Sequence, residues 1–521
     1  MKLRAGLLGS SHGWRQLLCQ EGLASAELDI LAEDPAAGHS VIVVARPPDA
    51  PEREALETYL RGGGALLGYA GFLDEVGGLT SRAEWLEYLT SDGEGPFGDL
   101  SLLDLGVNGR VSRESKTLRT QQNVHCAYAG VWQGGHVVLL PFDAGEAMTD
   151  QRAAAKSFYS PGERLPGERV SFVAKGEIRH LVRRSLEYLH CVRGIPYVHL
   201  WYFPGGKENI LLFRVDTDAA SKKEIDALAD VGRRSGIGFS WFIDVKSHQA
   251  LLSHFLSFVG HELGVHCYEH RVFDSYGENY ENLQKAKEAL RSIGILEPGI
   301  AAPYGNWNRE LARAIDDVGF AYSSEFSAGY DTLPFYPAAG PVEYRTLQVP
   351  IHPICPGSLR QAGFTVAAME EYSARVVGVK HARREPFAFY HHPSHGSLSA
   401  VWSTLQAAKE YGAIPMLMGE FARWWKDRAS RIHSARLDGP QLLFEEPAEG
   451  NLPAAPDIYL RIVEQGGREA LTPLQPAIDI RTLDWKVQPV YKPPTDIRRI
   501  REFDPRSLLA QIHNAMKRRL H

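Results

Sequence analysis

The sequence predicts an α/β protein of three domains, and three regions of the chain support this. Near the amino terminus, short apolar strands alternate with a helix and glycine-rich turns. In the middle a buried strand ends in acidic residues, and near the carboxyl terminus short strands alternate with turns. We expect an α/β domain at 1–150, a linker and helix at 151–194, a middle domain at 195–430 and a small β domain at 431–521. With 521 residues, 44% of them hydrophobic, the chain can build several cores.

In the first domain, apolar strands at 28–31 and 41–44 precede a helix near 52–60 and the triple glycine 62–64, which leads to another strand. Such alternation favours parallel pairing, and therefore a flavodoxin-like α/β sheet. The order of helix, triple glycine and strand resembles class I glutamine amidotransferase-like or ThuA-like domains. A working amidotransferase has a cysteine in the next turn, but here the turn is Gly68-Tyr69-Ala70-Gly71. We therefore expect a noncatalytic domain.

Residues 146–175 are rich in glycine, proline, serine and charge, which predicts a linker, and a helix is expected near Glu177–Cys191. The middle domain then opens with an apolar run at 210–213 that predicts a buried strand. This strand ends at Asp216-Thr217-Asp218. Carboxylates at the end of a strand face a cleft.

Two histidines further along the chain have the spacing of metal ligands. His266 and His270 are four residues apart, which would put two ring nitrogens on one side of a helical turn. With one carboxylate they make the three-ligand set of an open catalytic zinc site, whose fourth position is free for water.

Together these residues resemble the NodB-homology polysaccharide deacetylases, carbohydrate esterase family 4, over roughly residues 195–430. The family's first motif is a pair of aspartates at a strand end, and its second is His-x-x-x-His after a Gly-His-Glu-hydrophobic-Gly segment, here Gly260–Gly264. The resemblance implies a distorted (β/α) barrel with a divalent metal. It also implies that Asp216 is the general base and that Asp218, His266 and His270 bind the metal.

Two later segments follow in the family's order. Residues 299–305 resemble the segment that forms one wall of the active groove, which implies substrate contacts from Pro303, Tyr304 and Gly305. Residues 389–393 resemble the last motif, a histidine at a strand end. We align His392 with the catalytic histidine because a proline follows it, and His391 is the alternative.

The chain departs from the family pattern at three places. Ala301 stands where the family usually has an arginine that orients the base. Arg214 lies two residues before Asp216, on the same face of an extended strand, and is our candidate for the missing positive charge. Cys267 replaces the usual Ser or Thr of the second motif. The family's fourth motif has no clean match, with Glu325 or Asp331 as its candidates.

This set of residues suits hydrolysis of an amide or ester, because a metal ion polarises the carbonyl and acidifies water. We expect removal of N-acetyl or O-acyl groups from a carbohydrate, with Asp216 as base and His392 as acid. Zinc is the expected ion, although cobalt or another transition metal fits the same ligands. One alternative is a slow or inactive relative that binds a glycan or assembles with partners. Another is a small-molecule amide or formamide hydrolase.

After residue 425 short strands are expected near 441–444, 458–463 and 486–490, which predicts the small β domain. Residues 504–521 fit a capped helix with an apolar face and a basic end. Docking onto the β domain is the default for this helix, and peripheral membrane contact is a weaker alternative.

Composition excludes some classes of partner. A net charge of −6 implies no field that would collect nucleic acid or an anionic membrane. We find no apolar stretch that could span a bilayer and no secretory core at the amino terminus, so we expect a cytoplasmic protein. Five scattered cysteines suit free thiols in a reducing compartment. The sequence gives no indication of the oligomeric state.

Overall fold

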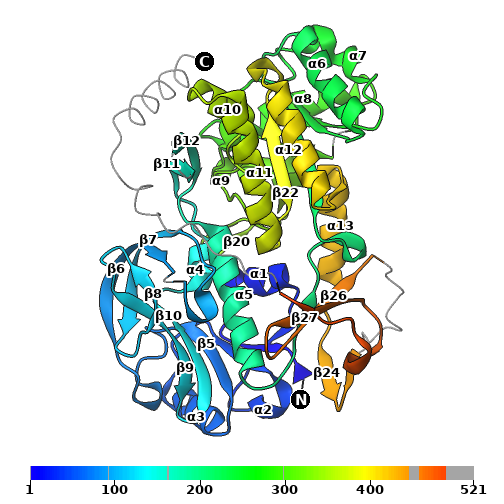
Figure 1. The fold of residues 1–521 in the computed structure, drawn as a ribbon. Coiled ribbons are helices and arrows are strands. Elements are labelled where there is room, and N and C mark those ends of the chain that lie inside the picture. The colour runs from blue at the N-terminus through cyan, green and yellow to red at the C-terminus, as the bar shows by residue number, and fades with distance from the viewer. Residues whose placement is uncertain (1, 92, 161–162, 297, 445–456, 489–521) are drawn as a thin grey trace. The chain divides into compact units, whose positions relative to one another are not determined.

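The computed structural model describes residues 2–91, 93–160, 163–296, 298–444 and 457–488 (Figure 1). The chain divides into two compact units. The first comprises the described residues of 1–150, 173–206 and 426–493, and the second those of 151–172 and 207–425. The expected C-terminal helix at 504–521 lies outside the described residues.

The first unit contains a nine-stranded sheet in the order β3-β2-β4-β5-β10-β9-β8-β6-β7. Its strands are β2 (Ala5–Leu8), β3 (Ser25–Glu27), β4 (Val41–Val44), β5 (Ala65–Tyr69), β6 (Ser81–Thr90), β7 (Leu103–Ser112), β8 (Thr117–Thr120), β9 (His125–Trp132) and β10 (Gly135–Leu140). The five strands from β3 to β10 pair in parallel, and their order is the flavodoxin-like one. The expected fold class is therefore confirmed for this part.

The helices of this unit are α1 (His12–Glu21), α2 (Pro35–Gly38), α3 (Ala50–Arg61), α4 (Ala144–Met148) and α5 (Lys175–Cys191). Helix α3 begins at a reciprocal cap, in which the Asp49 carboxylate accepts from the Glu52 backbone N–H and the Glu52 carboxylate accepts from that of Asp49. The strand expected at 28–31 is misplaced, because β3 ends at Glu27. The Asp29 carboxylate accepts the backbone N–H groups of the two residues after Ile30 and so holds a turn there.

Two four-stranded sheets complete the first unit, in the orders β1-β24-β25-β28 and β13-β26-β27-β29. Their strands are β1 (Lys2–Leu3), β13 (Tyr197–Leu200), β24 (Ala435–Asp438), β25 (Gln441–Phe444), β26 (Tyr459–Glu464), β27 (Arg468–Pro473), β28 (Ala477–Asp479) and β29 (Lys486–Val487). The region expected to be a separate β domain therefore pairs with strands from much earlier in the chain.

The second unit has a sheet of parallel strands in the order β21-β18-β17-β16-β15-β14-β22, with β23 paired to β14. The strands are β14 (Ile210–Asp216), β15 (Ser240–Ile243), β16 (Glu262–Val265), β17 (Gly299–Ile300), β18 (Tyr322–Ser323), β21 (Leu347–Gln348), β22 (Phe387–His391) and β23 (Ile414–Pro415). This curled sheet is open between β21 and β22, so the expected distorted barrel is confirmed.

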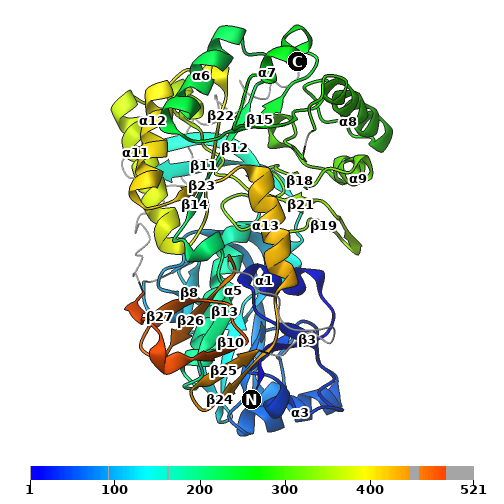
Figure 2. The same ribbon diagram turned by 90° about the vertical axis from the view of Figure 1, so that its right-hand side faces the viewer.

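Helices cover this sheet and bury a core that includes Phe213, Trp241 and Leu283. They are α6 (Lys222–Ser235), α7 (Leu252–Phe255), α8 (Tyr276–Arg291), α9 (Arg309–Val318), α10 (Pro356–Gln361), α11 (Val366–Arg383), α12 (Leu398–Glu410) and α13 (Met418–Ser430), the last of which continues into the first unit. Helices α11 and α12 pack side by side (Figure 2).

Residues 151–171 form a hairpin of β11 (Ala153–Ser160) and β12 (Glu163–Ser171) where the sequence predicted a linker. A further pair of short strands, β19 (Ala338–Ala339) and β20 (Val342–Glu343), lies outside the main sheet.

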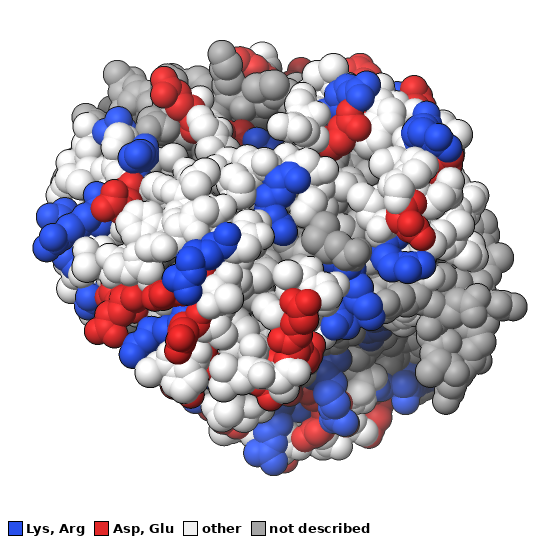
Figure 3. Space-filling model, turned by 90° about the horizontal axis from the view of Figure 1, so that it is seen from below, with Lys and Arg blue, Asp and Glu red and all other residues white. Residues whose placement is uncertain are grey.

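None of the helices in the described part of the chain has the length and apolar character that crossing a membrane requires. On the face drawn in Figure 3, acidic and basic side chains are interspersed.

Candidate active site

The candidate site lies where the parallel strands of the second unit end. Asp216 is the last residue of β14, His266 follows β16, Ala301 follows β17 and His392 follows β22. Because the strands are parallel and in register, with Val215 opposite His391, their carboxyl ends meet at one edge of the sheet. Residues far apart in the sequence are thereby brought together.

Three side chains at this edge have the geometry of a metal site. The His266 and His270 Nε2 atoms are 3.1 Å apart and lie 3.3 and 3.1 Å from Asp218 Oδ1. Three ligands around a tetrahedral zinc ion are separated by roughly 3.3 Å, given metal–ligand bonds of about 2.0–2.1 Å. The Nδ1–H of His266 donates to the Ala301 carbonyl at 2.6 Å, which leaves the Nε2 lone pair for an ion. The donor set and its spacing fit a divalent cation.

The loop that carries the two histidines is not the helical turn that their spacing suggested. Residues 266–270 have no helical structure, and Cys267 is in the left-handed conformation with φ of 64°. Asp218 and Tyr304 are also left-handed, with φ of 41° and 58°. Non-glycine residues rarely adopt this conformation, and clusters of them occur at functional sites. Cys267 is buried in the core and is not among the grouped ligands.

Arg214 and Asp216 form a buried two-pronged ion pair. Arg214 Nε and Nη2 donate to the two oxygens of Asp216 at 2.6 and 2.5 Å, and Nη1 donates to the Ser324 carbonyl. The guanidinium carbon also lies 5.6 Å from the centre of the Phe242 ring and 5.7 Å from the centre of the Tyr390 ring. Burial raises the pKa of Asp216, but Arg214 and the nearby imidazoles outweigh it and hold that pKa below its usual value.

Of the two adjacent histidines, His392 is the one that faces Asp218 in the candidate metal group. Its Nε2 atom lies 3.5 Å from Asp218 Oδ2, whereas His391 Nε2 donates to the Gly396 carbonyl at 2.7 Å. Burial lowers the pKa of His392, but the Asp218 carboxylate and the Cys355 thiol outweigh it and raise that pKa to about 10. When no ion is bound to it, this imidazole is therefore protonated.

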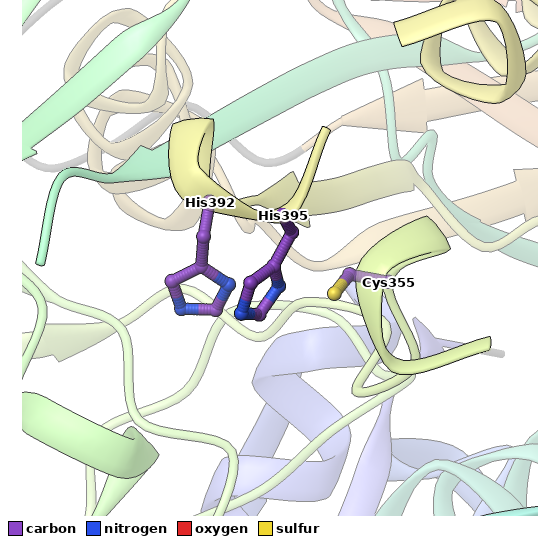
Figure 4. A group of neighbouring side chains, drawn as sticks. All are labelled: Cys355, His392 and His395. Atoms are coloured by element: carbon purple, nitrogen blue, oxygen red, sulfur yellow. The ribbon is translucent and has the colours of Figure 1, made fainter. Parts of the chain in front are cut away.

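Sequence reasoning missed two residues beside His392. Cys355 and His395 each place a ligand atom within 4.8 Å of the other and of one His392 ring nitrogen (Figure 4). Burial raises the pKa of the Cys355 thiol, but three neighbouring imidazoles hold it well below its usual value. The His-x-x-His spacing of His392 and His395 was the available signal. No spacing indicated Cys355, which lies far from both in the sequence.

Among the described residues, neither candidate for the fourth motif has a hydrogen bond or ion pair with His392. Glu325 Oε1 accepts the Ala302 backbone N–H at 3.0 Å. Asp331 accepts from His352 Nδ1 at 3.0 Å and from Lys380 at 2.5 Å. These carboxylates therefore brace the surrounding scaffold.

Pro303, Tyr304 and Gly305 form a single turn beside the candidate metal group. The Tyr304 ring packs edge-on against His270, with ring centres 4.9 Å apart. Gly305 has φ of 59°, and a Cβ there would lie 2.4 Å from the Phe326 ring. Glycine is needed at this position, and the turn that it permits places Tyr304 at the edge of the site.

No protein-family model and no curated protein matches the chain. Solved structures similar to part of the chain include polysaccharide deacetylases and members of carbohydrate esterase family 4. One from Mycobacterium smegmatis is 16% identical over 43% of this chain and 92% of its own, with a TM-score of 0.36. Another from Pseudomonas aeruginosa is 14% identical over the same shares of both chains, with a TM-score of 0.35. A pseudoenzyme of carbohydrate esterase family 4 from Bacillus anthracis is 12% identical over 53% of this chain and 92% of its own, with a TM-score of 0.30.

Proposed function

We propose that the chain is a metal-dependent hydrolase that removes N-acetyl or O-acyl groups from a carbohydrate. The observation that carries the proposal is the meeting of Asp218, His266 and His270, whose ligand atoms lie 3.1–3.3 Å apart, with His392 3.5 Å from the same aspartate. A proton donor beside a three-ligand metal group matches the chemistry of acyl hydrolysis. The motifs quoted from the sequence favour a sugar as the carrier of the acyl group.

A zinc-class ion bound there supplies a Lewis acid for the acyl carbonyl and for water. Asp216 takes the proton of the attacking water as its oxygen bonds to the acyl carbon. His392 donates its Nε2 proton to the departing amine or alcohol when the C–N or C–O bond breaks, and the products are a carboxylic acid and the deacylated sugar. Arg214 keeps Asp216 charged and fixed in one orientation. Each carboxylate oxygen has a second lone pair, so the ion pair leaves Asp216 able to accept a proton.

The second candidate is a metal-binding protein with slow or no hydrolysis, and the same ion pair favours it. Arg214 holds both oxygens of Asp216 and keeps the pKa of that carboxyl low, which weakens it as a base. In this case the site would bind a glycan without cleaving it.

One experiment separates the two candidates. Acetate release from acetylated saccharides, monomeric and polymeric, is measured together with the bound metal in wild type, Asp216→Asn and Asp218→Asn. Loss of hydrolysis with metal retained in Asp216→Asn supports the enzyme, and loss of one equivalent of metal in Asp218→Asn assigns the ligand. Metal binding without hydrolysis of any substrate by wild type supports the binding protein. Absence of bound metal in wild type contradicts both.

A further inference from the structure

Beside His392 the structure gathers a second set of metal-ligand side chains. Cys355 Sγ and one ring nitrogen each from His392 and His395 all lie within 4.8 Å of one another (Figure 4). Cys355 precedes α10, whereas His392 and His395 belong to the turn that follows β22. None of the three belongs to the group formed by Asp218, His266 and His270.

Unsatisfied nitrogens provide a second, independent observation. The Nδ1 atoms of His391, His392 and His395 are all buried, and none has a hydrogen-bond partner among the described residues. An unpaired buried polar atom costs about 1–3 kcal/mol, so three in one place require an explanation. The Cys355 thiol has a single proton and can satisfy at most one of them. A bound cation accepts several lone pairs at once.

The surrounding contacts suit ligation. The backbone N–H of Ser358 donates to Cys355 Sγ at 3.4 Å, which supports a sulfur that acts as an acceptor. His391 Nε2 donates to the Gly396 carbonyl, which leaves its Nδ1 with a lone pair, and the second ring nitrogen of His395 lies 3.4 Å from the Gln361 amide. A Cβ at Gly357 would lie 2.2 Å from His395 Nδ1, so only glycine lets this ring approach Cys355.

We propose that Cys355, His392 and His395 form a second metal site, which takes a zinc-class or softer transition-metal ion. One thiolate and two imidazoles are a ligand set that zinc, cobalt and copper(I) accept and that magnesium and calcium do not. Tetrahedral coordination needs ligand separations of roughly 3.3–3.6 Å, so the three side chains close in slightly on the ion. His391 Nδ1 or water is available as a fourth ligand.

This site shares His392 with the proposed hydrolase. His392 presents Nε2 to Asp218, and its other ring nitrogen, Nδ1, is the unpaired one. An ion on Nδ1 requires the His392 proton to sit on Nε2, facing Asp218. The existence of the site does not depend on hydrolysis, and its test reads metal binding alone.

The test is a cobalt titration of the metal-free full-length protein. Wild type should bind two equivalents and develop a near-ultraviolet thiolate-to-cobalt charge-transfer band. Asp218→Asn should keep that band, whereas Cys355→Ser should lose it together with one equivalent. The matched control is Cys191→Ser, which removes a half-buried thiol elsewhere and should behave as wild type.

Three outcomes overturn the proposal. They are a wild type that binds one equivalent without the band, a band that survives Cys355→Ser, and a band that is lost in Cys267→Ser instead. If Cys355→Ser fails to fold, His395→Gln replaces it and should weaken binding at this site roughly tenfold or more. Absence of acetate release with the band present contradicts only the proposed function.

Discussion

Arg214 and Asp216 lie two residues apart on one strand and meet through two hydrogen bonds of 2.6 and 2.5 Å. An extended strand places residues i and i+2 on the same face, so β14 carries both the carboxylate and its positive partner. Arg214 on β14 thus supplies the positive charge that an arginine at position 301 would otherwise provide.

Arg214→Lys is the sharpest test of this pair, because lysine keeps the positive charge but cannot donate the two parallel hydrogen bonds that a guanidinium makes to a carboxylate. We expect kcat for acetate release to fall by roughly 10- to 1,000-fold, since the base loses its fixed orientation, with metal content unchanged. Steady-state kinetics and metal analysis measure both. The control is Arg234→Lys, on the exposed side of α6. Full activity in Arg214→Lys would contradict a positioning role.

His392 and His391 should differ strongly in their effect on hydrolysis. His392→Gln removes the proton donor that faces Asp218 and should lower kcat by about 100- to 10,000-fold. His391→Gln should change it less than about tenfold, because that ring bonds the Gly396 carbonyl. Equal losses in the two variants would show that the wrong histidine has been assigned. Circular dichroism confirms that both variants fold.

The stability of the first unit should fall as the pH drops from about 6.5 to 4, and His190 is one cause. This buried ring lies 2.7 Å from the Leu186 carbonyl and 2.8 Å from the Ser40 hydroxyl. Burial lowers its pKa to about 4, against about 6.5 when unfolded. Between these two pKa values the unfolded chain binds a proton that the folded chain does not. This lowers the free energy of unfolding by up to ~3 kcal/mol, at about 1.4 kcal/mol for each pKa unit.

Urea unfolding of wild type and His190→Gln between pH 7 and 4.5 measures this effect. The transition midpoint should fall less steeply in the variant, and His125→Gln, a half-buried histidine of β9, is the control. Parallel pH profiles for wild type and His190→Gln would rule out His190 as the source.

Arg428 should be essential to the stability of the first unit. Its buried guanidinium donates to the carbonyls of Trp201, Leu200, Gln20 and Cys19. Arg428→Met leaves these oxygens without a donor and should lower the free energy of unfolding by about 3 kcal/mol or more. Arg423 is exposed on the part of the same helix that belongs to the second unit, so Arg423→Met should change this free energy by less than about 0.5 kcal/mol. Equal thermal midpoints for the two variants would contradict this role.

Much of the fold could be predicted from local patterns. Apolar runs indicate strands here. Val41–Val44 matches the fully buried β4, and Gln441–Phe444 matches β25, which is buried at alternate residues. The misplaced strand at 28–31 shows the limit of this reasoning. Leu28 and Ile30 are buried as a strand would require, but the Asp29 side chain holds the backbone in a turn. Apolar character predicts burial more reliably than it predicts conformation.

The candidate site was predictable where its residues occur in ordered motifs. Parallel pairing brings the carboxyl ends of the strands together, and the predicted site residues lie at or just after these ends: Asp216, Asp218, His266, His270 and His392. The loop of His266 and His270 was predicted as a helical turn, because spacing alone does not reveal the left-handed backbone at Cys267. Cys355 could not be predicted, since only the fold brings α10 to the end of β22.

The interrupted course of the first unit has a consequence for synthesis on the ribosome. Strand β13 pairs with β26, and more than two hundred residues separate the two strands in the sequence. Most of these residues are 207–425 of the second unit, and they are synthesised before β26. Those intervening residues carry their own core, so they can fold while β13 still lacks its neighbour. Until then the edge of β13 is open to wrong pairing, and expression of shortened chains that stop near residue 430 should favour aggregation.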